Sequence, residues 1–181
     1  MEADKKNYFK FALALFFCLL VRLIPMRAPN IEPILATTMP VSRAYGAFLG
    51  FFFAILSILL YDIATSTLGA QTFFTTLAYG LVGLWSAVYF KEKKVDKWVY
   101  ARFAIVGTLL YDALTGLTVG PIFFHQSFLD SLFLQIPFTA LHLLGNITFA
   151  VLLSPIIYNF FKKQQEKKSA ILITTLNPKT I

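Results

Sequence analysis

Cysteine and histidine are scarce in this chain. Its 181 residues include one cysteine, Cys18, and two histidines, His125 and His142. A single cysteine excludes a disulfide framework, and so few His and Cys residues give no cluster for zinc or haem. We therefore expect neither a metal site nor a cofactor.

Charged residues are also few, at 14% of the chain, whereas 57% of the residues are hydrophobic. This balance excludes an ordinary soluble globular domain. The nucleotide-binding pattern G-x-x-x-x-G-K-[ST] and the hydrolase patterns H-E-x-x-H and G-x-S-x-G are missing. We expect no catalytic residues and no enzyme activity, so uphill transport would need energy from a partner or from an ion gradient.

Long apolar runs dominate the chain, and its mean hydropathy is +0.69. Several runs approach or exceed the roughly 20 residues that cross a bilayer; they cover residues 8–21, 44–61, 72–90 and 132–161. The net charge of +7 comes from lysines and arginines clustered mainly at the ends of these runs, as in cytoplasmic loops. The sequence predicts an all-α, polytopic membrane helical bundle.

The predicted bundle occupies residues 1–163, and a basic tail follows at 164–181. Its helices are expected at 8–24, 33–43, 44–68, 71–90, 98–119 and 129–161, with a kink at Pro137. Prolines 25, 29 and 33 mark a non-helical connector before the short second helix. If that helix crosses the membrane, there are six spans with both termini inside. If it does not, five spans place the N-terminus outside, and the charge distribution leaves both topologies open.

A Tyr-Asp pair closes two of the apolar runs, at Tyr61-Asp62 and Tyr111-Asp112. A carboxylate at the centre of a membrane helix costs about 2.5–3.5 kcal/mol on insertion scales. Such residues usually face a bundle interior or a wet cavity. The repeat therefore predicts two helices that line one site.

Polar residues also recur at helical spacing. Gln135, Thr139, His142 and Asn146 form one stripe, and Thr108, Asp112 and Thr115 form another. We expect these stripes to line a cup that opens outward beneath the proline-rich loop. The predicted substrate-binding residues are Arg22, Asn30, Asp62, Thr65, Asp112, Thr115, Gln135, Thr139, His142 and Asn146. Arg22, Arg27 and Glu32 near the mouth suggest a ligand of mixed charge.

The predicted site residues could instead have purely structural roles. Asp62 and Asp112 could pair with Arg22 and Arg102, and His142 and Asn146 could hold helices together. Thr and Ser hydroxyls in membrane helices often bond only to their own backbone. Ala14 and Cys18 place two small residues four apart, a spacing that would suit docking of a partner helix.

A further pattern combines short motifs from separate parts of the sequence. They are the arginine that ends the first helix, Pro25, the Pro29-Asn30-x-x-Pro33 loop, the Tyr-Asp phrase and the Ile136-Pro137-Phe138…Leu144-Gly145-Asn146 helix. Together they resemble the substrate-binding S components of energy-coupling factor (ECF) transporters, over residues 8–160. The resemblance implies six transmembrane helices, cytoplasmic termini and capture of a vitamin-like micronutrient at the cell membrane. It also implies a transmembrane coupling protein and two cytoplasmic ATPase subunits as partners. Asn146 stands where related sequences often carry a carboxylate, so no particular vitamin is implied. The alternative is a proton- or sodium-coupled carrier built on the Tyr-Asp repeat.

Overall fold

The computed structural model describes residues 2–26, 30–94 and 96–162, and these form helices with no strand. The six labelled helices are α1 (Glu2–Arg22), α2 (Ile34–Tyr45), α3 (Ala47–Ala64), α4 (Ala70–Phe90), α5 (Lys97–Phe124) and α6 (Phe128–Leu152). After a turn at Leu153, residues 154–162 are again helical. The expectation of an all-helical chain is confirmed, while the predicted tail at 164–181 lies outside the described residues.

Four of the described helices, α3, α4, α5 and α6, are long and apolar enough to cross a membrane. Helix α2 has 12 residues, so it is about 18 Å long and shorter than the roughly 30 Å hydrocarbon core. Helix α1 begins with a charged segment and is not one of the four. The chain is therefore a membrane-embedded helical protein, with α2 contained within its bundle.

The predicted last helix, 129–161, is interrupted in the structure. The helix ends at Leu152, three residues before Pro155. Proline has no N–H to donate, and its ring clashes with the carbonyl four residues earlier, so Pro155 disfavours an unbroken helix here. Pro137 lies inside α6 and does not end it.

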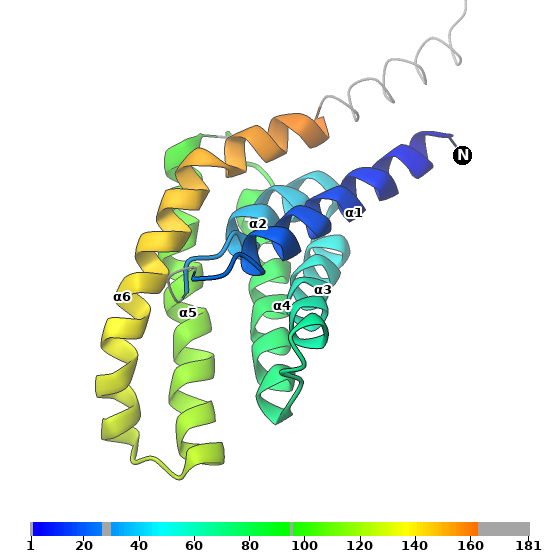
Figure 1. Ribbon diagram of the computed structural model, residues 1–181. Coiled ribbons are helices and arrows are strands. Elements are labelled where there is room, and N and C mark those ends of the chain that lie inside the picture. Colours follow the sequence, from blue (N-terminus) through cyan, green and yellow to red (C-terminus); the bar gives the residue numbers. More distant parts are fainter. Residues whose placement is uncertain (1, 27–29, 95, 163–181) are drawn as a thin grey trace, which may run out of the picture.

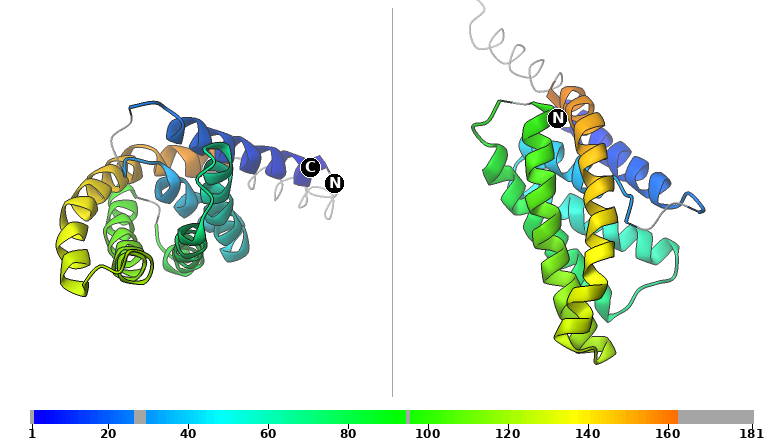
Figure 2. Two further views of the ribbon diagram at one scale, coloured as in Figure 1. Left: turned by 60° about the horizontal axis from the view of Figure 1, so that its bottom comes forward. Right: turned by 90° about the vertical axis from the view of Figure 1, so that its left-hand side faces the viewer.

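The long helices form two pairs. Helices α5 and α6 lie side by side on the left of Figure 1, and α3 and α4 form the pair on the right. Helix α1, α2 and the segment 154–162 lie toward one end of these pairs (Figures 1 and 2). Helix α2 contacts all five other labelled helices, which makes it the centre of the fold.

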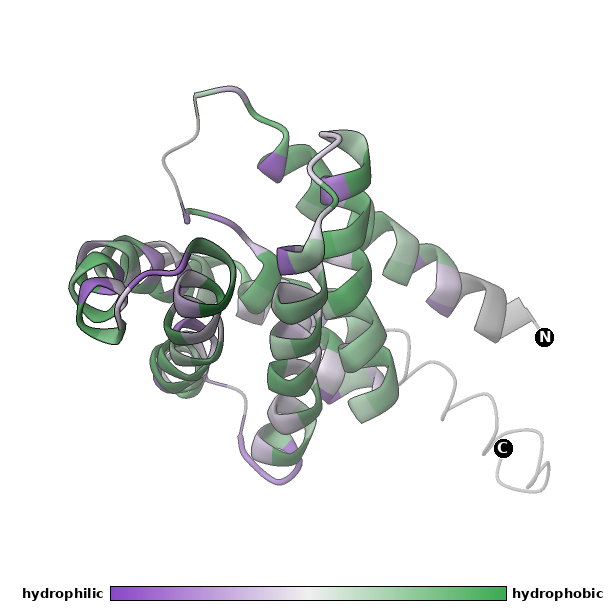
Figure 3. Cartoon of the chain, turned by 90° about the horizontal axis from the view of Figure 1, so that it is seen from below, coloured by the Kyte–Doolittle hydropathy of each residue, from purple (hydrophilic) through white to green (hydrophobic). Residues whose placement is uncertain are grey.

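Burial follows from this arrangement. Ile34, Leu35, Met39 and other α2 side chains are almost completely buried. The long helices instead expose large apolar side chains such as Phe48 and Phe73. Figure 3 shows that hydrophobic residues predominate along the helices. Because lipid is as apolar as these side chains, this distribution suits a bundle whose surrounding solvent is the bilayer.

Small residues allow α2, α3 and α4 to approach closely. A Cβ added to Gly83 of α4 would lie 2.7 Å from the backbone oxygen of Gly50 in α3. The hydroxyl of Ser42 in α2 donates a hydrogen bond of 3.0 Å to the carbonyl of Gly83. Small residues and interhelical hydrogen bonds of this kind stabilise helix packing in membranes.

Candidate functional site

The connector between α1 and α2, described at residues 23–26 and 30–33, enters the bundle. Glu32 is only 9% exposed, and its Oε2 lies 2.9 Å from Nε of Arg22, which ends α1. Arg22 also donates a 2.8 Å hydrogen bond to the carbonyl of Ser57 and lies over the ring of Tyr61, 3.9 Å from its centroid. The arginine thus ties α1 and the connector to α3.

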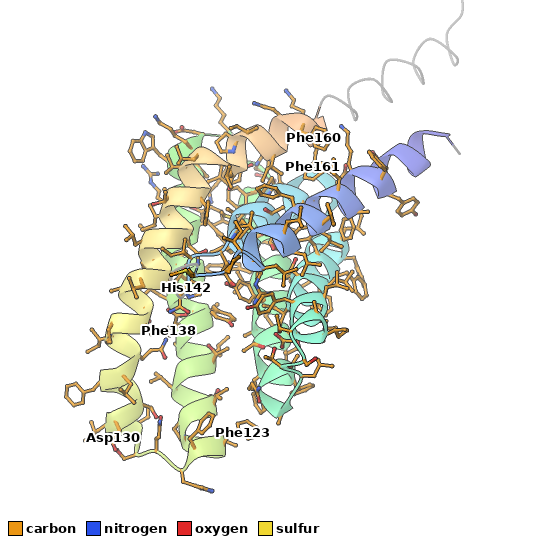
Figure 4. All side chains as sticks on the ribbon, in the orientation of Figure 1. Phe123, Asp130, Phe138, His142, Phe160 and Phe161 are labelled. Carbon is orange, nitrogen blue, oxygen red and sulfur yellow. The ribbon has the colours of Figure 1, made fainter. Side chains whose placement is uncertain are left out.

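Glu32 also starts a continuous polar chain across the bundle. The hydroxyl of Tyr79 in α4 donates to Glu32 Oε1 at 3.1 Å, and its oxygen lies 3.1 Å from Nε2 of His142 in α6. Nδ1 of His142 is 2.7 Å from Oδ1 of Asp112 in α5. Figure 4 shows His142 about midway along α6. Arg22, Glu32, Tyr79, His142 and Asp112 therefore join four helices and the connector.

The number of available hydrogens decides which side chains of this hydrogen-bonded series act as donors. Tyr79 has one hydroxyl proton, which goes to Glu32, so Nε2 of His142 must donate to the tyrosine oxygen. The contact between His142 Nδ1 and Asp112 then needs a second proton, on either the ring nitrogen or the carboxyl group. In both arrangements Asp112 and His142 together are electrically neutral. Neutrality matters because an unpaired buried charge is strongly destabilising.

Three of these side chains, Arg22, Glu32 and His142, form part of the wall of a cavity of about 370 Å³, called here the polar pocket. Its volume is at the lower end of the roughly 300–1,000 Å³ typical of small-molecule sites. The pocket is lined by Arg22, Asn30, Glu32, Ile58, Asp62, Thr67, Gln71, Thr75, Tyr111, Phe138 and His142. The rings of Tyr111 and Phe138 both lie nearly perpendicular to the ring of His142, with centroid separations of 5.6 and 5.9 Å.

Asp62, the carboxylate of the first Tyr-Asp pair, lies at the pocket wall. Its Oδ2 accepts a 2.7 Å hydrogen bond from the hydroxyl of Thr72 at the start of α4. The side chain is half-buried. Asp62 and Asp112 therefore have different positions: the first faces the cavity, and the second lies behind His142.

Four predicted site residues, Arg22, Asn30, Asp62 and His142, line the polar pocket, and Asp112 supports it. Thr65 and Thr115 do not line it. Their hydroxyls donate to the backbone carbonyls of Tyr61 and Tyr111, four residues earlier, at 2.8 and 2.9 Å. Thr115 thus has the backbone-bonded role that the sequence left open, whereas Thr65 also shares a 2.8 Å hydrogen bond with Thr67, which lines the polar pocket.

The rest of the α6 stripe diverges from the polar pocket. Gln135 donates a 3.2 Å hydrogen bond to Thr139, and both line a separate, largely apolar groove between α5 and α6. Asn146 is fully buried, and its Nδ2 donates to the hydroxyl of Thr108 in α5 at 2.8 Å. Asn146 thus links two helices. The sequence predicted that the whole stripe lines one cup, and the positions of Gln135, Thr139 and Asn146 correct that prediction.

The proposed docking pair is divided between the interior and the surface: Cys18 is buried, whereas Ala14 is half-buried and lines a surface groove. Cys18 is fully buried, and its Sγ lies 3.9 Å from the carbonyl oxygen of Pro33, while Ala14 packs beside it in the same apolar cluster. Because Cys18 is covered by the chain itself, it offers no surface to a partner. The alternative in which an aspartate pairs with Arg22 is not what the described residues show, because the ion-pair partner of Arg22 is Glu32. Arg27, expected near the mouth, lies outside the described residues.

The predicted site residues did not include seven that line the polar pocket: Glu32, Ile58, Thr67, Gln71, Thr75, Tyr111 and Phe138. They also did not include Tyr79, which supports the pocket from α4. Glu32 was expected in a loop above the cup, whereas the connector carries it into the interior. A signal for Tyr111 was available, since it adjoins Asp112 in the repeated phrase. Tyr79 had no such signal among the many aromatic residues.

Comparisons with protein-family models, with curated proteins and with solved structures give no match. Within residues 2–26, 30–94 and 96–162, no group of three His, Cys, Asp or Glu side chains is placed to hold a metal ion. The polar pocket offers a ligand hydrogen bonds, ion pairing and aromatic contacts.

Proposed function

We propose that this protein is the membrane-embedded, substrate-binding S component of an ECF-type importer that captures a vitamin-like micronutrient. The observation that carries the proposal is the polar pocket, where about 370 Å³ of space is lined by the buried Arg22–Glu32 ion pair and by His142, which is paired with Asp112. Buried charges are costly in a bilayer, so their convergence on one cavity favours a role in ligand binding.

In this proposal the chain has six helices in the cell membrane, of which α2, the short second one, extends through only part of the hydrocarbon core. Both termini are cytoplasmic. Basic residues gather at the end of the bundle that holds the α4–α5 loop, which supports this orientation. Among them, Lys10 donates to the carbonyl of Phe160, and Arg43 donates to the carbonyls of Phe90 and Lys93. The α5–α6 turn lies at the opposite end (Figure 1) and is placed outside.

The chain carries no nucleotide-binding motif, so transport depends on partners. We assign these roles to a transmembrane coupling protein and two cytoplasmic ATPase subunits. The isolated protein then binds its ligand without sodium and without ATP.

The proposal is tested by purifying the full chain, denaturing it and identifying released small molecules by mass spectrometry. A single organic compound at near-stoichiometric amount is expected from the wild type. His142→Ala should carry much less of it, since loss of one buried hydrogen bond weakens binding by about 1–3 kcal/mol. Equal amounts of the compound in both proteins would exclude the polar pocket as its site.

A second function is supported by the polar chain from Asp112 to Arg22, because intramembrane carboxylate and histidine chains serve as proton relays. A proton- or sodium-coupled carrier would transport its substrate without partner subunits. Vesicles that contain this chain alone separate the two functions. Uptake that disappears when the ion gradient is collapsed would favour the carrier, and binding without uptake would favour the S component.

A further inference from the structure

The charges of the polar pocket do not balance. Arg22 and Glu32 neutralise each other at 2.9 Å, and Asp112 and His142 share protons so that together they are neutral. Asp62 lines the same cavity and forms no ion pair within the described part of the chain. Among the described residues, the pocket therefore has an excess of one negative charge.

The hydrogen-bond partner of Asp62 does not remove this charge. The hydroxyl of Thr72 donates a hydrogen bond to Oδ2, which solvates the carboxylate but brings no compensating positive charge. A carboxylate in a half-buried, membrane-embedded cavity is stabilised by a cation more than by another neutral donor.

The neighbouring walls favour a cation for a second reason. Tyr111 and Phe138 line the cavity, and aromatic faces attract organic cations through their ring quadrupole. The same region already has this type of contact, because the guanidinium of Arg22 lies over the ring of Tyr61. Ile58 adds an apolar wall that suits the body of an organic molecule.

We infer that the polar pocket selects a small organic cation, with the positive group of the ligand against Asp62 and beside the rings of Tyr111 and Phe138. This inference rests on the proposed function and narrows its ligand to one charge class. It replaces the mixed-charge ligand suggested by the sequence, since Arg22 is already neutralised by Glu32.

Three probes of similar shape and different charge provide the test. Choline carries a trimethylammonium group, 3,3-dimethyl-1-butanol replaces its nitrogen by carbon, and 3,3-dimethylbutanoate is an anion. Binding of each probe to the purified full chain is measured at low salt by ligand-observed NMR, which detects weak complexes. We expect choline to bind about tenfold more tightly than the neutral alcohol, and the anion to bind least.

Variants at Asp62 assign the selectivity to this side chain. Asp62→Asn keeps an oxygen that can accept from Thr72 and should reduce the preference for choline to about the level of the neutral alcohol. Asp62→Glu retains the charge and should retain the preference. Asp96→Asn is the matched control, because Asp96 is exposed before α5 and its side chain makes no capping hydrogen bond. Size-exclusion profiles and helical circular dichroism verify that each variant is folded.

Equal affinity for choline and the alcohol, tighter binding of the anion, or no detectable choline binding would each overturn the inference. Choline selectivity that persists in Asp62→Asn would overturn it as well. The proposed function fails separately. A neutral or anionic compound released from the wild type and lost in His142→Ala would support the S component while contradicting a cation site. Selective choline binding without any captured micronutrient would support the cation site while contradicting the S component.

Discussion

Gly145 of α6 lies directly against Ile31 of the connector. A Cβ on Gly145 would be 3.0 Å from Cα of Ile31 and 3.1 Å from the carbonyl oxygen of Asn30. Both contacts are with backbone atoms, which cannot move away as a flexible side chain can. This close approach positions the connector so that Glu32, the next residue, reaches Arg22 and Tyr79.

Gly145→Ala should therefore displace the connector and lower stability by about 1–3 kcal/mol, the usual cost of overpacking. Gly107→Ala is the matched control in α5, because its nearest neighbour would be at an ordinary 3.4 Å. Alanine there should be neutral or stabilising, since it is the better helix former. Thermal unfolding in detergent measures both variants. A tolerated alanine at 145 would show that the connector does not depend on this contact.

The Asp112–His142 pair should behave as one unit. Asp112→Asn and His142→Gln each remove one member of a buried pair, and each is expected to cost about 3 kcal/mol. The double variant should cost clearly less than the two single effects added, because neither partner is left alone. A double-mutant cycle by denaturant unfolding gives the coupling energy. Additive single effects would mean that the two side chains do not interact.

Glu32 and Arg22 provide a second buried pair, at the pocket wall. Glu32→Gln keeps an oxygen for Tyr79 but leaves the guanidinium without its counter-charge, at a cost of about 3 kcal/mol. Arg22→Met combined with Glu32→Gln should recover most of that stability. Thermal unfolding of the single and double variants measures the recovery. If the double variant is no more stable than Glu32→Gln, the unpaired charge is not the cause of the loss.

Asn146 and His142 share a helix stripe but should separate in function. Asn146→Ala removes the hydrogen bond to Thr108 and should lower stability by about 1 kcal/mol while the captured ligand is retained. His142→Ala should reduce both stability and captured ligand. Mass spectrometry of released compounds, together with unfolding curves, measures the two effects. Loss of ligand in a stable Asn146→Ala protein would place Asn146 in the binding site.

The orientation of the pocket can be tested by cysteine labelling. On a Cys18→Ala background, a cysteine at Gln126 in the α5–α6 turn should react with a membrane-impermeant maleimide added to intact cells. A cysteine at Lys94, before α5, should react only after the membrane is permeabilised. Both positions are exposed in the structure, so accessibility within the protein is matched. The opposite labelling pattern would place the pocket mouth on the cytoplasmic side.

The sequence by itself determined that the protein lies in a lipid bilayer and that its fold is helical. Apolar runs of membrane length and basic residues at their ends are local properties, so they predicted α3, α4, α5 and α6. Helical spacing also placed Asp112 and His142 on predicted interior stripes, and the structure joins them. Such inferences succeed because a helix face depends only on residues a few positions apart.

The tertiary structure alone decided which polar residues share a cavity. Gln135, His142 and Asn146 lie on one stripe, yet along its length α6 faces the α5–α6 groove, then Tyr79 and Asp112, and then Thr108. The path of the connector likewise decides that Glu32 is buried against Arg22. Periodicity specifies a direction around a helix, whereas the neighbour met in that direction depends on how distant segments pack.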